Sequence, residues 1–426
     1  MTKVASEMLQ ERSTLLYCKL MKYIRWLRGD RFNRVVWRIA GVLTSIYNDT
    51  YLLKGIEKHS GKSLRILYVG NIYSMRYIAK LLFSGHPDIQ KNSRIFVKRV
   101  GKLIGAENAD MLIVCCDGFF SKLFPNDFDF IIPEWLKFEL DTSPPLSVIE
   151  RGFSSGAKKD VKRIISRGYT YELTEDPIVK KFFYRKMFLP YTIKRYKDEI
   201  LPHYPIYVKY LTDMRGMKLL MVRDRDGNDV VGGLVKFSGD KAILPSMGVL
   251  NGDERYLKEY AVAALFYFHI LVAKQHNVKR INFGNTRPFM NDGNFQFKRK
   301  WGMEISPSDT MTNVYLIKIM NLSPAVESFL TNNPFVFVDP VSNDLSGFLY
   351  TKIIDPSNLI KLAKRYLTLG MNGLYICSPS KYNKELLSRM KDLHNATVYN
   401  SLEVRMETHK MLNEEMICLK ISKRVS

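Results

Sequence analysis

Short apolar runs that alternate with helix-like segments constrain the fold of this chain most strongly. Runs such as LRILYVG (64–70) and DMLIVCCD (110–117) end at turn or charged residues, and YSMRYIAKLLF (73–83) between them has helical periodicity. Each helix needs an apolar surface on which to bury its own apolar face, and a sheet provides one. The pattern therefore predicts an α/β fold with mixed, partly antiparallel sheets.

The length of 426 residues exceeds that of one typical domain and predicts two or three cores. Changes in pattern and a Pro-rich break at Thr142–Pro145 suggest boundaries. The predicted parts are a mainly helical N-terminal segment (1–60), a first α/β domain (61–145), a second one with the active site (146–318), and a C-terminal α/β segment (319–426).

The chain is strongly basic, with a formal net charge of +23. Anionic small substrates, anionic membranes and RNA are all compatible with such a charge. The excess is spread along the chain, which favours a generally basic surface over a dedicated nucleic-acid arm. DNA is therefore not an expected partner, whereas tRNA remains possible. Aromatic and basic residues interleaved over residues 15–42 leave open a peripheral contact with a membrane.

The five cysteines show no spacing typical of a disulfide framework, and they do not combine with histidines at metal-ligand spacing. Buried thiols in a reducing cytoplasm are the expected state, and no metal is predicted. The N-terminus lacks the uninterrupted apolar core of a signal peptide. The longest apolar segment, AVAALFYFHILVA (261–273), is shorter than a membrane span and suits a buried helix.

Residues 281–302 carry the densest functional signal. An apolar run ends at Gly284 and opens into a Gly- and Asn-rich loop, and the stretch from Lys279 to Gly302 has six Lys or Arg and one carboxylate, Asp292. In α/β folds, loops that follow strands commonly bind ligands. The alternative interpretation is a basic surface loop beside a buried Trp301.

A second motif, Gly152-Phe153-Ser154-Ser155-Gly156, matches the G-x-S-x-G pattern of serine hydrolases. The preceding SVIER is charged where a hydrolase has a buried strand, and no oxyanion segment precedes it. Chance Gly/Ser loops also satisfy this pattern. Ser154 or Ser155 is therefore predicted to cap a helix that ends at Gly168.

The order of elements over residues 150–305 is more specific than either motif. A basic helix, a second helix, antiparallel strands, a turn, a long buried helix and another strand follow one another. With VVGGLVKF, MGVLNGD and FGNTRPFMNDGNFQFKRKWG, this order resembles the GNAT acyltransferase superfamily, and most closely its Fem-like branch with tandem GNAT domains. SSGAKKDVKRIISRGYTYEL looks like the entry to the second domain of that branch. The resemblance covers about 150 residues, is suggestive over 64–145 and is absent after about 320.

The resemblance implies an acyl donor, acetyl-CoA or another acyl-CoA, held along the strand KAILPSMGVL. Its pyrophosphate would then meet backbone amides of the following turn. The implied cofactor-binding residues are Met247, Gly248, Val249, Asn251 and Gly252. This turn has fewer glycines than the family pattern, and Asp253 would repel a phosphate. An ordinary turn capped by Asn251 or Asp253 is the alternative.

Within this family frame, Asp292 is the candidate base or amine-positioning carboxylate, and Tyr267 is a candidate general acid, with Tyr256 as the alternative. The candidate substrate-binding residues are Asn285, Arg287, Lys298 and Lys300. The resulting hypothesis is an N-acyltransferase that acylates an amine on an anionic small-molecule, sugar or peptide acceptor. The alternatives are an aminoacyl-tRNA-dependent Fem-like transferase and a non-catalytic binding protein with a GNAT fold.

Overall fold

The computed structural model describes residues 42–43, 45–105, 109–124, 127–196, 203–309, 312–340, 342–352, 354, 358–379, 397–399, 402–411 and 414–423. These residues form two compact units, each assembled from separated stretches of chain. Unit 1 contains Lys137–Gly284 and Phe297–Glu304. Unit 2 contains the described residues from 42 to Leu136, Asn285–Gln296, and the described residues from Ile305 onward. The predicted domain boundaries, which run consecutively along the chain, remain predictions.

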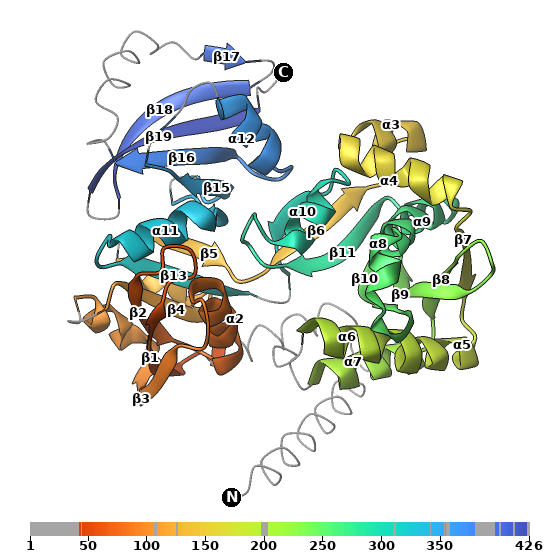
Figure 1. Cartoon of the computed structure of the whole chain (residues 1–426), viewed down its shortest axis with the longest axis horizontal. Helices are drawn as coiled ribbons and strands as arrows, with labels where there is room; N and C mark the ends of the chain where they lie inside the picture. Colours follow the sequence, from red (N-terminus) through yellow and green to blue (C-terminus); the bar gives the residue numbers. More distant parts are fainter. Residues whose placement is uncertain are drawn as a thin grey trace, which may run out of the picture. The chain divides into compact units, whose positions relative to one another are not determined.

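The first sheet belongs to unit 2 and has the strand order β3-β1-β2-β4-β13-β5 (Figure 1). Its strands are β1 (Tyr47–Ile56), β2 (Ser63–Val69), β3 (Asp88–Phe96), β4 (Met111–Asp117), β5 (Phe130–Pro133) and β13 (Asn313–Ile319). The accompanying helical segments are α2 (Ile72–Leu82), η1 (Val97–Leu103) and η2 (Phe120–Leu123). β2 and β4 are parallel, and α2 connects the end of β2 with the strands that follow.

The second sheet has the order β12-β6-β11-β10-β9-β8-β7. Its strands are β6 (Leu136–Asp141), β7 (Thr170–Thr174), β8 (Met217–Arg223), β9 (Asp229–Ser238), β10 (Lys241–Val249), β11 (Arg280–Thr286) and β12 (Glu304–Pro307). The helical segments are α3 (Leu146–Arg151), α4 (Ser155–Ser166), α5 (Pro177–Phe182), η3 (Phe183–Phe188), α6 (Leu189–Tyr196), α7 (His203–Asp213), η5 (Leu250–Gly252), α8 (Glu254–Lys258), α9 (Ala261–Gln275) and α10 (Gly293–Arg299).

Each of these two sheets includes a strand that is remote in sequence from its neighbours. β13 follows every strand of the second sheet along the chain, yet it inserts between β4 and β5. β6 comes before the other strands of the second sheet, yet it lies between β11 and β12. The largely apolar sequence of β13 (NVYLIKI) suits its interior position, because a strand within a covered sheet is buried on both faces. β6 (LKFELD) instead alternates between buried apolar and half-buried or exposed charged residues, so only one of its faces is fully buried.

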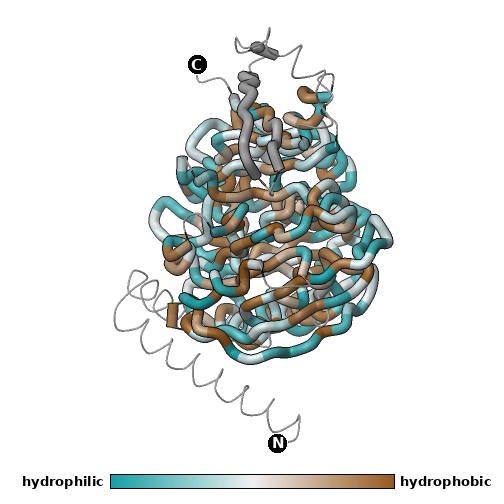
Figure 2. The backbone as a smooth tube through the Cα atoms, turned by 90° about the vertical axis from the view of Figure 1, so that its left-hand side faces the viewer, coloured by the Kyte–Doolittle hydropathy of each residue, from teal (hydrophilic) through white to brown (hydrophobic). Residues whose placement is uncertain are grey.

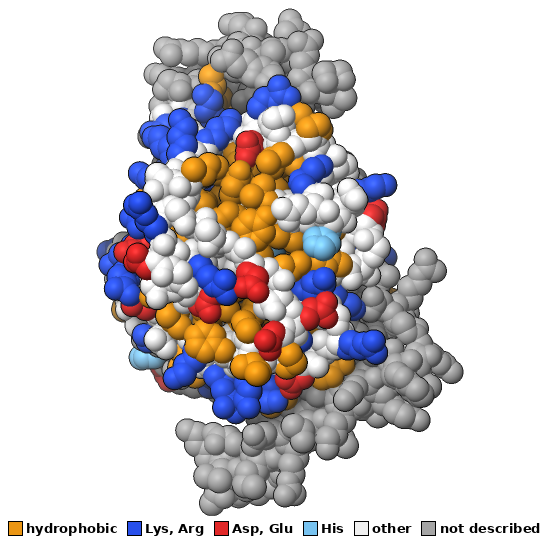
Figure 3. Space-filling view, turned by 90° about the vertical axis from the view of Figure 1, so that its right-hand side faces the viewer, with side chains coloured by type: hydrophobic (Ala, Val, Ile, Leu, Met, Phe, Trp, Pro, Cys, Tyr) orange, Lys and Arg blue, Asp and Glu red, His pale blue; other side chains and the backbone are white. Residues whose placement is uncertain are grey.

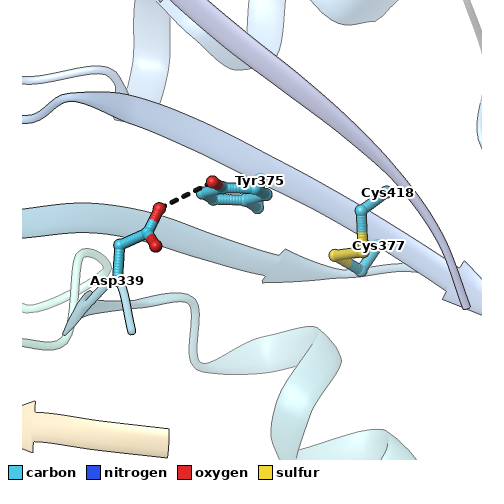
Figure 4. The surroundings of a disulfide bond; sticks show 4 residues. All are labelled: Asp339, Tyr375, Cys377 and Cys418. Carbon is cyan, nitrogen blue, oxygen red and sulfur yellow. Dashed lines mark hydrogen bonds between the residues drawn. A yellow bond between two sulfur atoms is a disulfide. The ribbon is translucent and has the colours of Figure 1, made fainter. Parts of the chain in front are cut away.

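The third sheet, in unit 2, has the order β14-β15-β16-β19-β18-β17. Its strands are β14 (Phe335–Val338), β15 (Leu345–Tyr350), β16 (Gly373–Pro379), β17 (Thr397–Tyr399), β18 (Leu402–Met411) and β19 (Glu414–Lys423), accompanied by α11 (Pro324–Asn332) and α12 (Leu359–Tyr366). A disulfide joins the directly paired Cys377 and Cys418 on β16 and β19 (Figure 4). This bond differs from the expectation of free thiols, whereas Cys115 and Cys116 are free and buried as expected.

The apolar runs of the sequence form the buried cores. One core joins a face of the first sheet, α2, α11 and the third sheet, so the C-terminal segment shares its hydrophobic interior with the first sheet. A smaller core lies under η1 and η2 on the other face of the first sheet. In unit 1, α5, η3 and α7 pack on the second sheet. Figure 2 shows hydrophobic stretches running along the strands.

Local sequence signals agree closely with the observed elements. Ser154 caps α4 by accepting a hydrogen bond from the amide of Ala157, and Asp176 caps α5, which begins at Pro177. The turn over residues 226–229 joins the antiparallel strands β8 and β9, as predicted. Residues 47–56 are an exception, because they form β1 inside a segment that was expected to be mainly helical. The rest of that prediction, residues 1–41, lies outside the described residues.

Among the described residues, no helix combines the length and apolar character needed to cross a membrane. Lys and Arg side chains are dispersed among hydrophobic and acidic ones on the face drawn in Figure 3, which fits the dispersed charge of the sequence.

Candidate functional site

The parallel strands β10 and β11 of unit 1 diverge before either of them ends. They pair over only three residue pairs, the last of which joins Ile243 and Asn282. β10 also changes register against β9 between Ile243 and Ser246. On β11, the amide of Gly284 donates to Asn282 Oδ1 at 2.8 Å, and Gly284 has a φ of +79°. We call this region the β10–β11 divergence.

Two buried polar groups near the divergence have no hydrogen-bond partner within the described part of the chain. One is the hydroxyl of Ser246, which follows the change of register on β10, and the other is Nε2 of His269 on α9. The His269 ring approaches Gly233 of β9 and Phe283 of β11, so it lies beneath the intervening β10. Buried polar groups are normally satisfied, and two exceptions close to one strand point to a ligand.

His269 is neutral at physiological pH. Burial lowers the pKa of His269 to about 4, although its hydrogen bond with the carbonyl of Leu265 opposes this effect. His269 Nδ1 lies 2.7 Å from that carbonyl oxygen, which can only accept a hydrogen bond. Nδ1 therefore carries the proton, and Nε2 is left as an acceptor.

The start of α9 is electropositive. Tyr260 precedes the helix with a φ of 70°, and no side chain of the described residues caps the helix at this position. The guanidinium groups of Arg163, on α4, and Arg167, which follows the end of α4, lie 4.7 and 5.7 Å from the centre of the Tyr260 ring. Uncapped amides, the helix dipole and two arginines together favour an anion at this position.

Tyr267, the predicted general acid, lies further along α9. Its hydroxyl donates to Glu150 Oε1 at 2.8 Å. Burial, and then the hydrogen bond and charge of Glu150, raise the pKa of Tyr267 far above its usual value. The phenol therefore stays protonated at neutral pH, with its proton directed at a carboxylate.

The predicted cofactor turn packs against the helices that precede β8. A Cβ on Gly248 would lie 2.4 Å from the backbone nitrogen of Phe188, and one on Gly252 would lie 2.8 Å from the carbonyl oxygen of Pro190. Asn251 has a φ of 52°, and Asp253 caps α8. Close packing thus explains both glycines. Of the other two candidates, Val249 is buried and Met247 is half-buried.

Of the predicted cations, Lys298 and Lys300 lie in unit 1. Lys298 is buried, and its Nζ donates to the carbonyl of Gly284 at 3.0 Å, next to the divergence. Lys300 forms an ion pair of 2.6 Å with Asp160 on α4. Both ammonium groups therefore hold segments of unit 1 together in this structure.

The remaining predicted site residues lie in unit 2. The carboxylate of Asp292 accepts hydrogen bonds from the amides of Asn294 and Phe295, and so caps α10. Asn285 donates to the hydroxyl of Ser308 at 3.2 Å. Arg287 forms an ion pair of 2.8 Å with Glu134. Their assignment to catalysis or substrate binding remains a prediction.

Sequence reasoning did not single out Ser246, Arg163 or Arg167 as site residues. A signal for Ser246 was available, because Pro245-Ser246 interrupts an otherwise apolar strand. The two arginines were noted only as the polar side of their helix. Their position beside Tyr260 depends on tertiary packing.

The chain was compared with known proteins. No protein-family model and no curated protein matches it. Among solved structures, FemX is 15% identical with a TM-score of 0.34 and covers 62% of this chain and 83% of its own. L-PGS from Bacillus licheniformis is 13% identical with a TM-score of 0.31, covering 64% and 86%. A tandem GNAT protein from the clavulanic acid biosynthesis pathway is 10% identical with a TM-score of 0.27, covering 66% and 86%.

The described residues of the chain form an α/β fold with three mixed sheets. In unit 1, β8, β9 and β10 are antiparallel, a helical connection follows, and β11 returns parallel to β10 before diverging from it. This is the order that the sequence resemblance predicted. Unit 2 has a similar order. β1 and β2 are antiparallel, α2 follows β2, and β4, which comes after β3 and η1 along the chain, pairs parallel to β2.

Proposed function

We propose that this chain transfers an acyl or aminoacyl group to an amine, and that unit 1 holds the donor. The observation that carries this proposal is the β10–β11 divergence, where two parallel strands separate beside polar groups that lack partners. An extended amide-containing arm, such as the pantetheine of coenzyme A, could pair with the backbone of β10 there, much as a peptide adds to the edge of a sheet.

The anionic end of an acyl-CoA donor would reach the start of α9. The uncapped amides, Arg163 and Arg167 are suited to a pyrophosphate, because arginine binds phosphate oxygens in a bidentate manner. Met247 and Val249 would contribute backbone along β10, whereas Gly248, Asn251 and Gly252 would shape the turn. When bound, coenzyme A would supply the thioester from which the acyl group is transferred.

The chemistry requires an unprotonated amine, a stabilised oxyanion and a proton for the leaving group. Tyr267 retains its proton at neutral pH and is the candidate donor of the proton that the leaving group needs. Lys298 lies beside Gly284 and is a candidate for stabilising negative charge near the divergence. Asp292 is the candidate for positioning the acceptor amine, and Asn285 and Lys300 are candidates for binding an anionic acceptor. Arg287, the other predicted anchor, is held in its ion pair with Glu134 and is assigned a structural role instead.

Donor binding tests this proposal directly. Titration of the full chain with acetyl-CoA in a calorimeter should give saturable binding. The double variant Arg163→Ala/Arg167→Ala should weaken it at least about tenfold, since two charge-assisted contacts are lost. Lys159→Ala/Lys162→Ala is the matched control, because it removes the same charge from α4. Equal weakening by both double variants would contradict the assigned anion position, and no binding by the wild type would exclude acetyl-CoA as the donor.

An aminoacyl-tRNA donor is the second candidate, and the net charge of +23 favours it. If the donor is tRNA, binding of tRNA should be saturable and fall steeply with salt, and acetyl-CoA should not compete. Transfer of a radiolabelled acyl or aminoacyl group, measured for Tyr267→Phe and Asp292→Asn, then tests the catalytic assignments. Unchanged transfer in both variants would remove Tyr267 and Asp292 from the mechanism.

A further inference from the structure

Unit 2 has a hollow of about 530 Å³ on the first sheet, where β1, β2, β3 and η1 meet. Its size falls within the range of small-molecule sites, roughly 300 to 1,000 Å³. Leu52 of β1 and Leu67 of β2 are directly paired residues and contribute to its floor, and Leu103 of η1 adds a third apolar wall. Leu67 and Leu103 belong to the hydrophobic core beneath η1, so the floor continues an apolar interior.

The lining of this hollow has cations and no carboxylate. Arg94, Arg99 and Lys102 contribute three positive charges. Arg94 is already paired with Asp49 at 3.1 Å. Arg99 and Lys102 are exposed and have no ion-pair partner within the described segments. The carboxylate of Asp127 lies close to Gly101, which falls between Arg99 and Lys102 in the sequence, but Asp127 is not among the residues that line the hollow.

Neutral polar groups complete the edge formed by β3. The hydroxyl of Thr50 donates to the carbonyl of Ser93 at 2.6 Å, where β1 and β3 lose register between Asp49 and Tyr51. Asn92 and Ser93 also line the hollow at this irregularity. The hollow thus has an apolar floor, a cationic side on η1 and a neutral polar side on β3.

We infer that this hollow binds an amphiphilic anion, a molecule with a single aliphatic chain and a phosphate or carboxylate head. The chain would lie on Leu52, Leu67 and Leu103, and the head would meet Arg99 and Lys102. An amphiphilic anion uses both parts of the hollow, because its chain covers the apolar floor and its head pairs with the two cations. This site is separate from the β10–β11 divergence and is not part of the proposed transfer reaction.

Octyl phosphate is a suitable probe, used as a monomer and titrated into the full chain by calorimetry. Saturable binding is expected, at least about tenfold tighter than that of inorganic phosphate, because the apolar chain adds buried area. Arg99→Ala/Lys102→Ala should weaken binding at least about tenfold, and Leu52→Gln should also weaken it. Unchanged circular dichroism and thermal midpoints would verify that these variants fold.

The matched control is Lys58→Ala/Lys98→Ala, which removes the same charge from exposed positions outside the lining; Lys98 is on η1 itself. This variant should bind octyl phosphate as the wild type does. Equal weakening by both double variants, or no saturable binding by the wild type, would overturn the inference.

Vesicles that contain an anionic phospholipid identify the source of the ligand. Binding to vesicles that octyl phosphate displaces, and that Arg99→Ala/Lys102→Ala weakens, would assign the site to a lipid headgroup. Binding of octyl phosphate alone would assign it to a free amphiphile. Vesicle binding without octyl phosphate binding, unaffected by Leu52→Gln, would reflect general surface charge and overturn the inference.

Discussion

Each unit contains a pair of parallel strands whose connection includes a helix, but the two units complete this arrangement differently. The connection consists of η5, α8 and α9 in unit 1, and of α2, β3 and η1 in unit 2. In unit 2, β2 and β4 pair over four residue pairs, and α2 begins immediately after β2. Asn71 caps α2 by accepting from the amide of Ser74 at 2.9 Å. In unit 1, β10 and β11 pair over three residue pairs, and no side chain caps α9. The start of α2 is therefore capped by a side chain, whereas the start of α9 has no side-chain cap from the described residues.

Buried polar groups extend this contrast. Beside α2, the hydroxyl of Ser74 donates to Glu134, and Arg287 donates to both Glu134 and the hydroxyl of Tyr315. The Arg287 guanidinium also lies 4.2 Å from the ring centre of Tyr77 and 3.9 Å from that of Trp135. The side chains around Glu134 in unit 2 are thus satisfied, whereas Ser246 Oγ and His269 Nε2 in unit 1 have no partner among the described residues.

The comparison suggests why one of two similar folds would carry the reaction. A satisfied network stabilises a single arrangement and leaves no donor or acceptor for a ligand. Unpartnered buried groups reduce stability, and a ligand that satisfies them gains affinity. We therefore expect unit 2 to be the more sensitive to loss of a polar side chain.

The largest effect is expected for Arg287→Met. Removing the guanidinium leaves the Glu134 carboxylate buried without its charged partner, which should lower the free energy of unfolding by about 3–5 kcal/mol. Urea denaturation of the variant measures this. A double variant, Arg287→Met/Glu134→Leu, should recover part of the loss. If Arg287 instead binds substrate without a structural role, its variant would lose transfer activity at unchanged stability, and the comparison would fail.

The next effect concerns pH and unit 1. His269 has a pKa of about 4 in the fold and about 6.5 when unfolded, so the unfolded chain binds a proton first as the pH falls. Its contribution to stability is therefore complete above pH 6.5 and is lost between pH 6.5 and 4, by up to about 3 kcal/mol.

His269→Met should flatten this part of the stability profile in denaturant titrations between pH 4 and 7. His276→Gln, at an exposed position close to the end of the same helix, is the control and should retain the slope. An unchanged slope in His269→Met would show that the buried imidazole does not stay neutral in the fold.

A smaller effect on stability is expected when the hydroxyl of either of two buried serines, Ser74 or Ser246, is removed. Ser74→Ala should destabilise the protein by about 1–3 kcal/mol, because the Glu134 carboxylate loses a hydrogen bond. Ser246→Ala should be neutral or stabilising by up to about 1 kcal/mol, since its hydroxyl has no partner to lose. Thermal unfolding of both variants provides the measurement. Equal destabilisation would mean that the Ser246 hydroxyl is satisfied in solution.

The smallest effect on stability is expected for the N-terminal cap of α2, which is compared with the proposed ligand site at the start of α9. Asn71→Ala removes the cap of α2 and should cost about 1 kcal/mol. Addition of acetyl-CoA should leave this loss unchanged, because the donor is proposed to bind at α9. The same ligand should raise the thermal midpoint of both wild type and Asn71→Ala. A ligand effect that disappears in Asn71→Ala would move the donor site to unit 2.

Much of the fold could be predicted from local sequence. The apolar run ending in Cys115-Cys116 became the buried strand β4, and the long apolar segment became the buried helix α9. Less of the candidate site could be predicted from local sequence. Asp292 and Gly248 have the residue types that a transferase site uses, but in the structure one caps α10 and the other allows close packing against Phe188. Carboxylates and glycines serve both purposes, and only their neighbours distinguish them.

The sequence alone determined the helix caps, the turn between β8 and β9, and the alternation of strands and helices. These features depend on backbone hydrogen bonds and side chains only a few residues apart, so their signals lie within one segment. Tertiary structure decided the insertion of β13 between β4 and β5, the disulfide between Cys377 and Cys418, and the ion pair between Arg287 and Glu134, 153 residues apart. Such pairings depend on which buried faces meet, and no short stretch of chain encodes that choice.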